Sequence, residues 1–290
     1  MIRVQPLFEH RHAFGGIETR VLELEGEGAP VVLLHGYADS ADTWRHTLAA
    51  LAREDRRALA VDLPGFAEAN PLDGEGPVLP QLDRFVDGVV EHAAQDGQGV
   101  VVVGNSLGGT LALRAGQRGD ALPLAGIVPV APAGFDMAAW FVLIERNPLL
   151  QTILAIPTPL PEGVVREAVG RVYSVLAFAD PGRVERSVVD AFTYHHRDRA
   201  RVRRYLQAAR RLLPELADPF ELERIRCPVL LVWGDRDRLV SVRGARHVAD
   251  ALPQARVELL EGCGHCPQIE EPERFATLLR DFPASLRRAA

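Results

Sequence analysis

Short apolar runs rich in valine and leucine alternate along this chain with segments of helical periodicity. Such alternation is the signature of strand–helix–strand units that build a mostly parallel sheet, so it predicts an α/β fold. We expect strands at residues 17–24, 30–34, 58–61, 99–103, 124–130, 228–233 and 256–260. We expect helices at residues 43–52, 81–95, 107–115, 242–251 and 272–282.

The first expected strand, Ile17–Leu24, alternates apolar and polar residues. That pattern is typical of an antiparallel strand at the edge of a sheet, and the preceding Gly15-Gly16 predicts a hairpin turn. Further along the chain, residues 62–80 are rich in proline and glycine, which predicts a long surface loop before the next helix.

The alternation breaks between about Ala133 and Leu222, where no strand pattern occurs. Proline disrupts a helix interior, so the prolines of this region divide it into short helices. They are Pro148, Pro157, Pro159, Pro161, Pro181 and Pro214. We therefore expect a core made of residues 1–134 and 223–290, and an inserted helical cap made of residues 135–222.

The charge of the chain excludes several classes of function. Its 290 residues include 33 basic residues, all of them arginine, and 39 acidic ones, for a net charge of −6. A Schiff-base or P-loop lysine is therefore excluded, and the net charge gives no general attraction to nucleic acid. The first residues are charged where a signal peptide needs an apolar run, and no stretch approaches the ~18 apolar residues of a membrane span. We expect a cytoplasmic protein without nucleic-acid partners or stable membrane insertion.

A candidate nucleophile lies between the most apolar strand and the helix after it. Residues 104–108 read G-N-S-L-G and are followed by Gly109, which matches the G-x-S-x-G pattern. A nucleophile on a sharp strand-to-helix turn sits in a strained backbone, and only small neighbours allow that close approach. The N–H groups at the start of the helix favour developing negative charge beside Ser106. The alternative is a glycine-rich helix start without chemistry.

A serine hydroxyl is a weak nucleophile that needs a base, and the base needs an orienting acid. His265 follows the last strand, and Asp237 follows the strand before it, so the order is serine, aspartate, histidine. Asp235 and Asp136 are the competing acids. The other histidines that we weighed lie before the sheet or on expected helix faces: His10, His12, His46, His92 and His247.

These motifs together resemble the α/β-hydrolase superfamily, over nearly the whole chain from about Ile17 to Phe282. His35-Gly36 looks like the HG oxyanion loop of that family, in which the N–H of the following residue, Tyr37, acts with that of Leu107. The resemblance implies a mostly parallel sheet of about eight strands flanked by helices, with an inserted helical cap. It implies no cofactor and no metal.

A second family feature departs from the usual pattern. Residues 62–66 read D-L-P-G-F and look like the DxPGxG turn of the family, but Ala67 stands where a glycine is usual. We expect this difference to affect the conformation of the loop and not the catalytic residues.

The resemblance implies a serine hydrolase, since the related dehalogenases and epoxide hydrolases carry aspartate in place of Ser106. We expect Ser106, His265 and Asp237 to cleave a small-molecule carboxylic ester through an acyl-enzyme, as in carboxylesterases and lipases. The G-N-S-x-G-G form also resembles carbon–carbon bond hydrolases of ring-fission products. Those usually have a Gly-Pro-containing HG loop, whereas this chain reads HGYADSADTW, so that function ranks second. A non-catalytic ligand-binding module ranks third, and the sequence leaves acyl length and oligomeric state open.

The chain contains three cysteines, Cys227, Cys263 and Cys266, too few for a secreted disulfide framework. The last two form a C-x-x-C around His265, which elsewhere marks redox or zinc sites. We expect small buried packing residues here, with an oxidisable switch as the alternative and zinc the least favoured.

Two groups of residues in the insertion have both a structural and a functional interpretation. An arginine cluster is expected to form a solvated helix face, with an anionic-substrate site as the alternative. It comprises Arg197, Arg199, Arg201, Arg203, Arg204, Arg210 and Arg211. An apolar cluster earlier in the insertion is expected to form subdomain core, an acyl pocket, or both. Its candidate substrate-binding residues are Trp140, Phe141 and Ile153.

Overall fold

A computed structural model describes residues 5–94, 97–136, 162–195 and 199–286. It contains an eight-stranded sheet with the strand order β1-β2-β4-β3-β5-β6-β7-β8. The strands are β1 (Leu7–Phe14), β2 (Ile17–Leu24), β3 (Glu27–Leu34), β4 (Arg56–Val61), β5 (Val100–Asn105), β6 (Leu124–Val130), β7 (Leu230–Gly234) and β8 (Arg256–Leu260). Strands β3 to β8 pair in parallel, while β1 and β2 pair antiparallel. The predicted mostly parallel α/β sheet is confirmed.

The first hairpin differs from our prediction in one respect. Gly15 and Gly16 form the expected turn, and both have the positive φ, 55° and 83°, that two-residue hairpin turns favour. However, β1 pairs outside β2, so Ile17–Leu24 is antiparallel but not at the edge. The prediction that His10 and His12 lie before the sheet was also wrong, because both residues lie on β1. The sequence hides β1, since most of its side chains are exposed and supply no apolar run.

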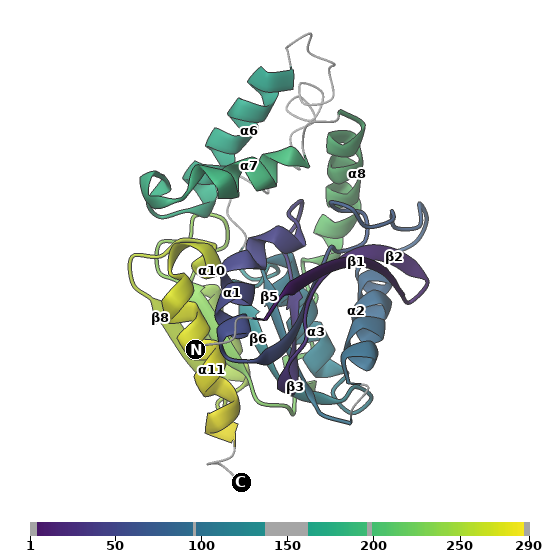
Figure 1. The fold of residues 1–290 in the computed structure, drawn as a ribbon, viewed down its shortest axis with the longest axis vertical. Coiled ribbons are helices and arrows are strands. Elements are labelled where there is room, and N and C mark those ends of the chain that lie inside the picture. Colours follow the sequence, from purple (N-terminus) through teal and green to yellow (C-terminus); the bar gives the residue numbers. More distant parts are fainter. Residues whose placement is uncertain (1–4, 95–96, 137–161, 196–198, 287–290) are drawn as a thin grey trace.

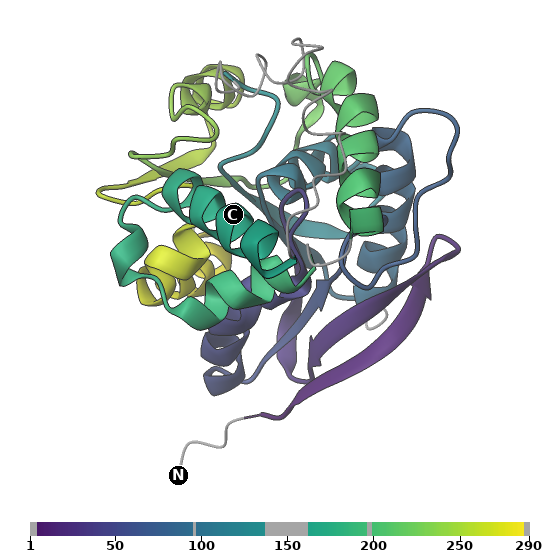
Figure 2. The same ribbon diagram turned by 90° about the horizontal axis from the view of Figure 1, so that it is seen from above.

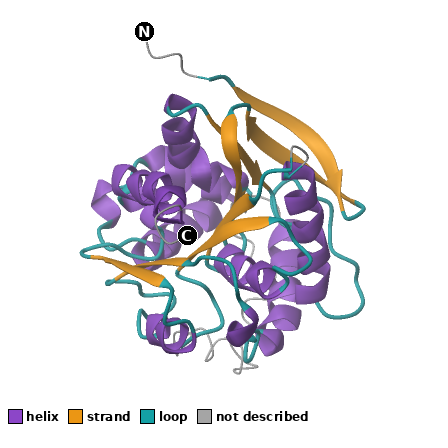
Figure 3. Ribbon diagram, turned by 90° about the horizontal axis from the view of Figure 1, so that it is seen from below, coloured by secondary structure: helices purple, strands orange, loops and turns teal. Residues whose placement is uncertain are grey.

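Helices cover both faces of the sheet (Figures 1 and 3). On one face α1 (Arg45–Arg53) and α11 (Pro272–Leu286) pack against the strands, and on the other α2 (Leu79–Ala93), α3 (Leu107–Gln117) and α9 (Gly244–Ala251) do so. Successive residues of a strand point to opposite faces. Accordingly Val31 and Leu33 belong to one core cluster, and Val32 and Leu34 to the other. Burial on both faces explains why the central strands are continuous apolar runs.

The loop expected at residues 62–80 is only partly a surface loop. Its first residues, including Leu63 and Phe66, are buried in the core, whereas residues 70–77 are exposed or half-buried. Pro80, expected in the loop, lies in the first turn of α2, where proline is tolerated because the N–H there has no helical partner.

Further helices lie between β6 and β7 along the chain. They are α6 (Glu162–Ala177), α7 (Arg186–Tyr194) and α8 (Arg199–Glu215), with a short 3-10 turn η2 (Pro181–Arg183) before α7. In Figure 1 these three helices stand at the top of the molecule, above the sheet. Figure 2, seen from that side, shows α6 and α7 over one part of the core and α8 over another. The expected pocket residues Trp140, Phe141 and Ile153 lie outside the described residues.

Candidate active site

Ser106 forms the turn between β5 and α3. Its backbone has φ 55° and ψ −114°, a combination that is costly for a residue with a side chain. The turn is held on both sides, because the Ser106 N–H donates to the Val130 carbonyl (2.9 Å) and its carbonyl accepts from the Thr110 N–H (2.9 Å). The surrounding sheet and helix therefore keep the serine in a strained conformation.

The glycines of the G-N-S-L-G turn are required by close backbone contacts. A Cβ atom on Gly104 would lie 2.1 Å from the Gly108 carbonyl oxygen, and one on Gly108 would lie 2.1 Å from that of Leu34. Both distances are far below van der Waals contact, so any larger residue would push β5, α3 and β3 apart. A Cβ on Gly36 would lie 3.3 Å from the Ser106 Cβ, which places the HG loop directly against the serine.

His265 and Asp237 are in direct contact. Nδ1 of His265 lies 2.7 Å from Oδ2 of Asp237, and the two side chains are 5% and 0% exposed. The carboxylate also accepts from the Leu239 and Val240 N–H groups (2.8 and 2.9 Å) and from the Trp233 indole N–H (3.1 Å). These bonds fix the carboxylate and direct Nδ1 of the histidine toward it, which leaves Nε2 for a partner in the pocket.

The competing acids have other partners. Oδ1 of Asp235 accepts from the Gly262 N–H (2.7 Å), and Oδ2 of Asp136 lies 3.8 Å from Nε2 of His247 in a largely exposed pair. Of the three acids that the sequence offered, Asp237 is the one with a hydrogen bond to His265.

Asn105 connects the nucleophile turn, residues 104–108, to the histidine loop, which comprises residues 261–266 between β8 and the next helix. Its Nδ2 donates to the His265 carbonyl (2.9 Å), and its side chain is buried. The His265 N–H in turn donates to the carbonyl of Ala177 (2.7 Å), at the end of α6. Sequence reasoning missed this role, although the amide between Gly104 and Ser106 in the motif was the available signal.

Glu270 in α10 (Pro267–Glu270) makes a second link between the histidine loop and the insertion. Oε1 accepts from the Gly264 N–H and Oε2 from the Ala179 N–H, both at 2.7 Å. Burial raises the pKa of Glu270, and these backbone donors partly offset that effect. This role was not predictable from the sequence, because Glu270 lies in an ordinary acidic stretch.

The HG loop is fixed through a neutral histidine. Burial lowers the pKa of His35 to about 4, so the ring is uncharged near neutral pH. Nδ1 lies 2.7 Å from the Gly36 carbonyl and donates to it, while Nε2 accepts from the Leu63 N–H (2.8 Å). Tyr37, the next residue, lines the same pocket as Ser106 and Leu107, the two residues at the start of α3. The first N–H groups of a helix have no partner within it, so they can bind an anion.

One pocket brings the predicted residues together. Ser106, His265, Tyr37 and Leu107 all line it. Most of its remaining wall is apolar and includes Ala133, Ala209, Leu212, Leu216, Leu239 and Val240. The arrangement offers a serine hydroxyl, an imidazole held by a carboxylate, and an apolar cavity for a substrate.

The arginines described on α8 lie away from this pocket. Arg204 and Arg210 are exposed, while Arg201 and Arg211 donate to the carbonyls of Ala67 (3.2 Å) and Gly76 (2.7 Å). The same helix supplies Ala209, Leu212 and Leu213 to the pocket wall, as expected of an amphipathic helix.

The cysteines flanking His265 are buried thiols. Burial raises the pKa of both Cys263 and Cys266, so both stay protonated near neutral pH. The part of the chain that is described contains no cluster of three or more histidine, cysteine or acidic residues suited to a metal ion. Nor does any described helix have the length and apolarity to cross a bilayer.

The chain is similar to several known proteins. A family model described as "Alpha/beta hydrolase family" matches residues 31–278. The chain is 29% identical to a 2-hydroxy-6-oxo-6-(2'-aminophenyl)hexa-2,4-dienoic acid hydrolase of Metapseudomonas resinovorans, over 92% of this chain and 88% of the relative. It is 28% identical to monoacylglycerol lipase abhd6-A of Xenopus laevis, over 90% and 77%. A solved serine hydrolase involved in carbazole degradation matches with a TM-score of 0.77 and 24% identity, over 96% and 99% of the two chains, and shares the fold.

Proposed function

The chain belongs to the α/β-hydrolase family and is a hydrolase, and we propose that it cleaves carboxylic esters of small or lipophilic substrates through an acyl-enzyme. The observation that carries this proposal is the 2.7 Å contact of Asp237 with His265, which lines a mostly apolar pocket together with Ser106. A relative named as a monoacylglycerol lipase supports ester chemistry.

In the proposed mechanism Ser106 Oγ attacks the ester carbonyl while Nε2 of His265 takes its proton. Asp237 holds the imidazole tautomer and stabilises the imidazolium that forms. The N–H groups of Tyr37 and Leu107 bind the oxyanion, and one such donor contributes roughly 3 kcal/mol to lowering the barrier. His265 then protonates the leaving alcohol, and a water that it activates releases the acid.

We also propose that residues 135–222 act as a cap over a core made of residues 1–134 and 223–290. Support comes from the pocket wall, to which α6 contributes Tyr173, α7 contributes Phe192 and α8 contributes Leu212. A cap of this kind would exclude water and hold the acyl chain.

Carbon–carbon bond hydrolysis is the second candidate. It is supported by the relative named as a hexa-2,4-dienoic acid hydrolase. A dienoate carries a carboxylate, yet the described residues that line the pocket include the acidic Asp39 and no arginine. That difference in charge favours neutral esters over dienoates.

The test is hydrolysis of a p-nitrophenyl ester series from acetate to palmitate, with a ring-fission dienoate measured alongside. Ser106→Ala is the critical variant, and Ser241→Ala, outside the pocket lining, is the matched control. Ester turnover that is lost only in Ser106→Ala supports the proposal. Dienoate cleavage without ester turnover would favour the second candidate, and inactivity on both would favour a non-catalytic binding module.

A further inference from the structure

Asp39 lies in the loop between β3 and the 3-10 turn η1 (Ala41–Trp44), two residues after Tyr37. It is only 7% exposed, and it lines two cavities at once. One is the pocket of Ser106, and the other is a neighbouring cavity of about 180 Å³. Asp39 therefore belongs to the wall that separates the two cavities.

The two cavities differ in character. Tyr173 and Phe192 share the dividing wall with Asp39, and their rings stack with centroids 3.6 Å apart and planes 6° from parallel. On the far side polar and charged residues are more numerous among those that line the cavity, and they include Ser40, Thr43, Arg45, His46, Glu185 and Ser187. On the Ser106 side Asp39 is the acidic residue of an otherwise mostly apolar surface.

The groups around Asp39 do not neutralise its charge. One carboxylate oxygen accepts from the Ser40 N–H (2.8 Å), and the Thr43 hydroxyl also hydrogen-bonds to it. Within the described part of the chain, no ion pair to its carboxylate is formed.

The charged and titratable groups that face Asp39 come from several elements. They are Asp42 in η1, Asp62 after β4, Tyr173 on α6, Cys266 and His265 on the histidine loop, and Arg45, His46 and Glu185 around the neighbouring cavity. Burial is the largest cause that raises the pKa of Asp39, to about 7, and the nearby acids Asp42 and Asp62 add to it. Asp39 thus changes charge within the neutral pH range.

We propose that Asp39 determines specificity, because its carboxyl group contacts the substrate in the Ser106 pocket and selects neutral substrates over those that carry a carboxylate. Two negative charges a few ångströms apart in a poorly solvated cavity repel strongly, and desolvation removes the screening that water would give. When protonated, the same group donates a hydrogen bond to a neutral polar substrate group. The kinetic part of this inference rests on the proposed ester hydrolysis.

The kinetic experiment compares two matched esters, p-nitrophenyl valerate and the p-nitrophenyl monoester of glutaric acid, which differ by a terminal carboxylate. The measured quantity is the ratio of kcat/KM for the neutral ester to that for the anionic ester. We expect Asp39→Asn to lower this ratio at least about tenfold at pH 8. Asp250→Asn, an exposed position on α9, makes the same charge change and should leave the ratio unchanged. An equal ratio in wild type and Asp39→Asn would overturn the proposal.

The pH dependence gives a second readout. In the wild type the ratio should rise between pH 6 and pH 8, because Asp39 loses its proton there and repels the anionic ester. In Asp39→Asn the rise should be absent. The same rise in both proteins would assign the effect to another group and contradict the proposal.

A binding experiment tests the inference without turnover. Calorimetric titration of octanoate and octanamide into Ser106→Ala and into Ser106→Ala with Asp39→Asn compares a charged and a neutral ligand. We expect the preference for the amide to fall at least about tenfold in the double variant, and an unchanged preference would overturn the inference. If this preference falls but the wild-type protein cleaves no ester, the inference about Asp39 is supported and only the proposed ester hydrolysis is rejected. Asp39→Ser removes the same charge and replaces the asparagine variant if that variant does not fold.

Discussion

The strained backbone of Ser106 has a consequence for stability. Its φ of 55° with ψ of −114° suits glycine, and strain of this kind costs about 1–3 kcal/mol, against about 0.5–1 kcal/mol for the greater freedom of glycine when unfolded. We therefore predict that Ser106→Gly is more stable than Ser106→Ala by about 1 kcal/mol, which raises Tm by a few degrees. Thermal unfolding of the two inactive variants measures this difference. A lower Tm for the glycine variant would contradict a strained turn.

Asp39 should make stability depend on pH. Its pKa is about 7 in the folded protein and near 3.8 in an ordinary environment, so between these values the folded state binds one more proton than the unfolded state. Stability from this group is present below pH 4 and is lost as the pH rises to about 7, by roughly 4 kcal/mol in all. We predict that Asp39→Asn gains Tm relative to the wild type between pH 5 and pH 8. Asp250→Asn is the control. A Tm difference between Asp39→Asn and the wild type that does not change with pH would contradict the presence of a buried carboxyl group that titrates.

Between elements, Glu270 joins the histidine loop to the segment after α6. Glutamine can accept from only one of the two N–H groups, those of Gly264 and Ala179, and its own NH₂ would face the other. We predict that Glu270→Gln loses about 1–3 kcal/mol of stability. We also predict that it loses about tenfold in kcat with little change in KM, because His265 shifts. Glu261→Gln, at an exposed position of the same loop, is the control, and equal kinetics in both variants would exclude this positioning role.

The sequence predicted the elements that carry a strong local signal. The parallel strands were predictable because burial on both faces makes them apolar runs. The serine turn was predictable because its backbone passes so close to neighbouring backbone that a Cβ atom on its glycines would lie 2.1 Å from a carbonyl oxygen. Strand β1 was missed because its exposed residues depend on pairing with β2. Asn105 and Glu270 were missed because their partners are backbone groups brought together by the fold. Ala67, noted for replacing a glycine, adopts φ 43°, so it occupies the conformation that glycine favours.

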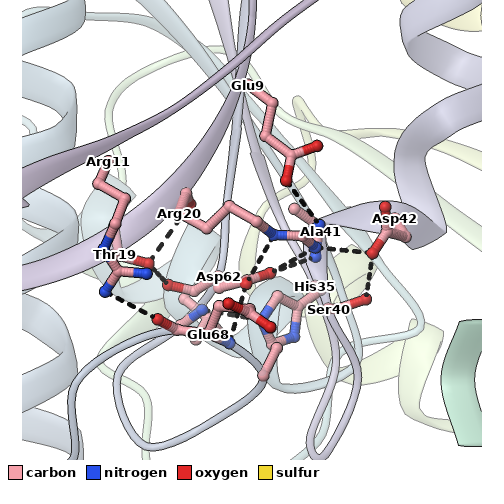
Figure 4. A network of polar contacts seen from close by, with 12 residues as sticks. Glu9, Arg11, Thr19, Arg20, His35, Ser40, Ala41, Asp42, Asp62 and Glu68 are labelled. Carbon is pink, nitrogen blue, oxygen red and sulfur yellow. Dashed lines mark hydrogen bonds and ion pairs between the residues drawn. The ribbon is translucent and has the colours of Figure 1, made fainter. Parts of the chain in front are cut away.

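At the scale of the whole molecule, a buried ion-pair network joins the antiparallel and parallel parts of the sheet (Figure 4). The fully buried Asp62, after β4, accepts from Nε of Arg20 on β2 (3.0 Å), from the Ala41 N–H (2.7 Å) and from the Glu68 N–H (3.1 Å). Arg20 also contacts Asp42 at 2.7 Å.

Removal of one partner from a buried ion pair leaves an uncompensated charge. We predict that Asp62→Asn loses about 3–5 kcal/mol of stability, which lowers Tm on the order of 10 °C. The control is Glu273→Gln, which breaks the Arg53–Glu273 pair at the surface, where the Glu273 side chain is 85% exposed. That change should cost less than about 1 kcal/mol. Equal losses in the two variants would show that the buried network contributes no more than a surface pair.

The central claim, that Ser106 is a nucleophile activated by His265, is tested most directly by labelling with a fluorophosphonate probe and locating the modified residue by mass spectrometry. We predict a single phosphonylated residue, Ser106, with labelling that falls sharply in His265→Ala and is unchanged in His247→Ala, a half-exposed histidine on α9. Folded wild-type protein that is not labelled, or that is labelled at another serine, would contradict the account.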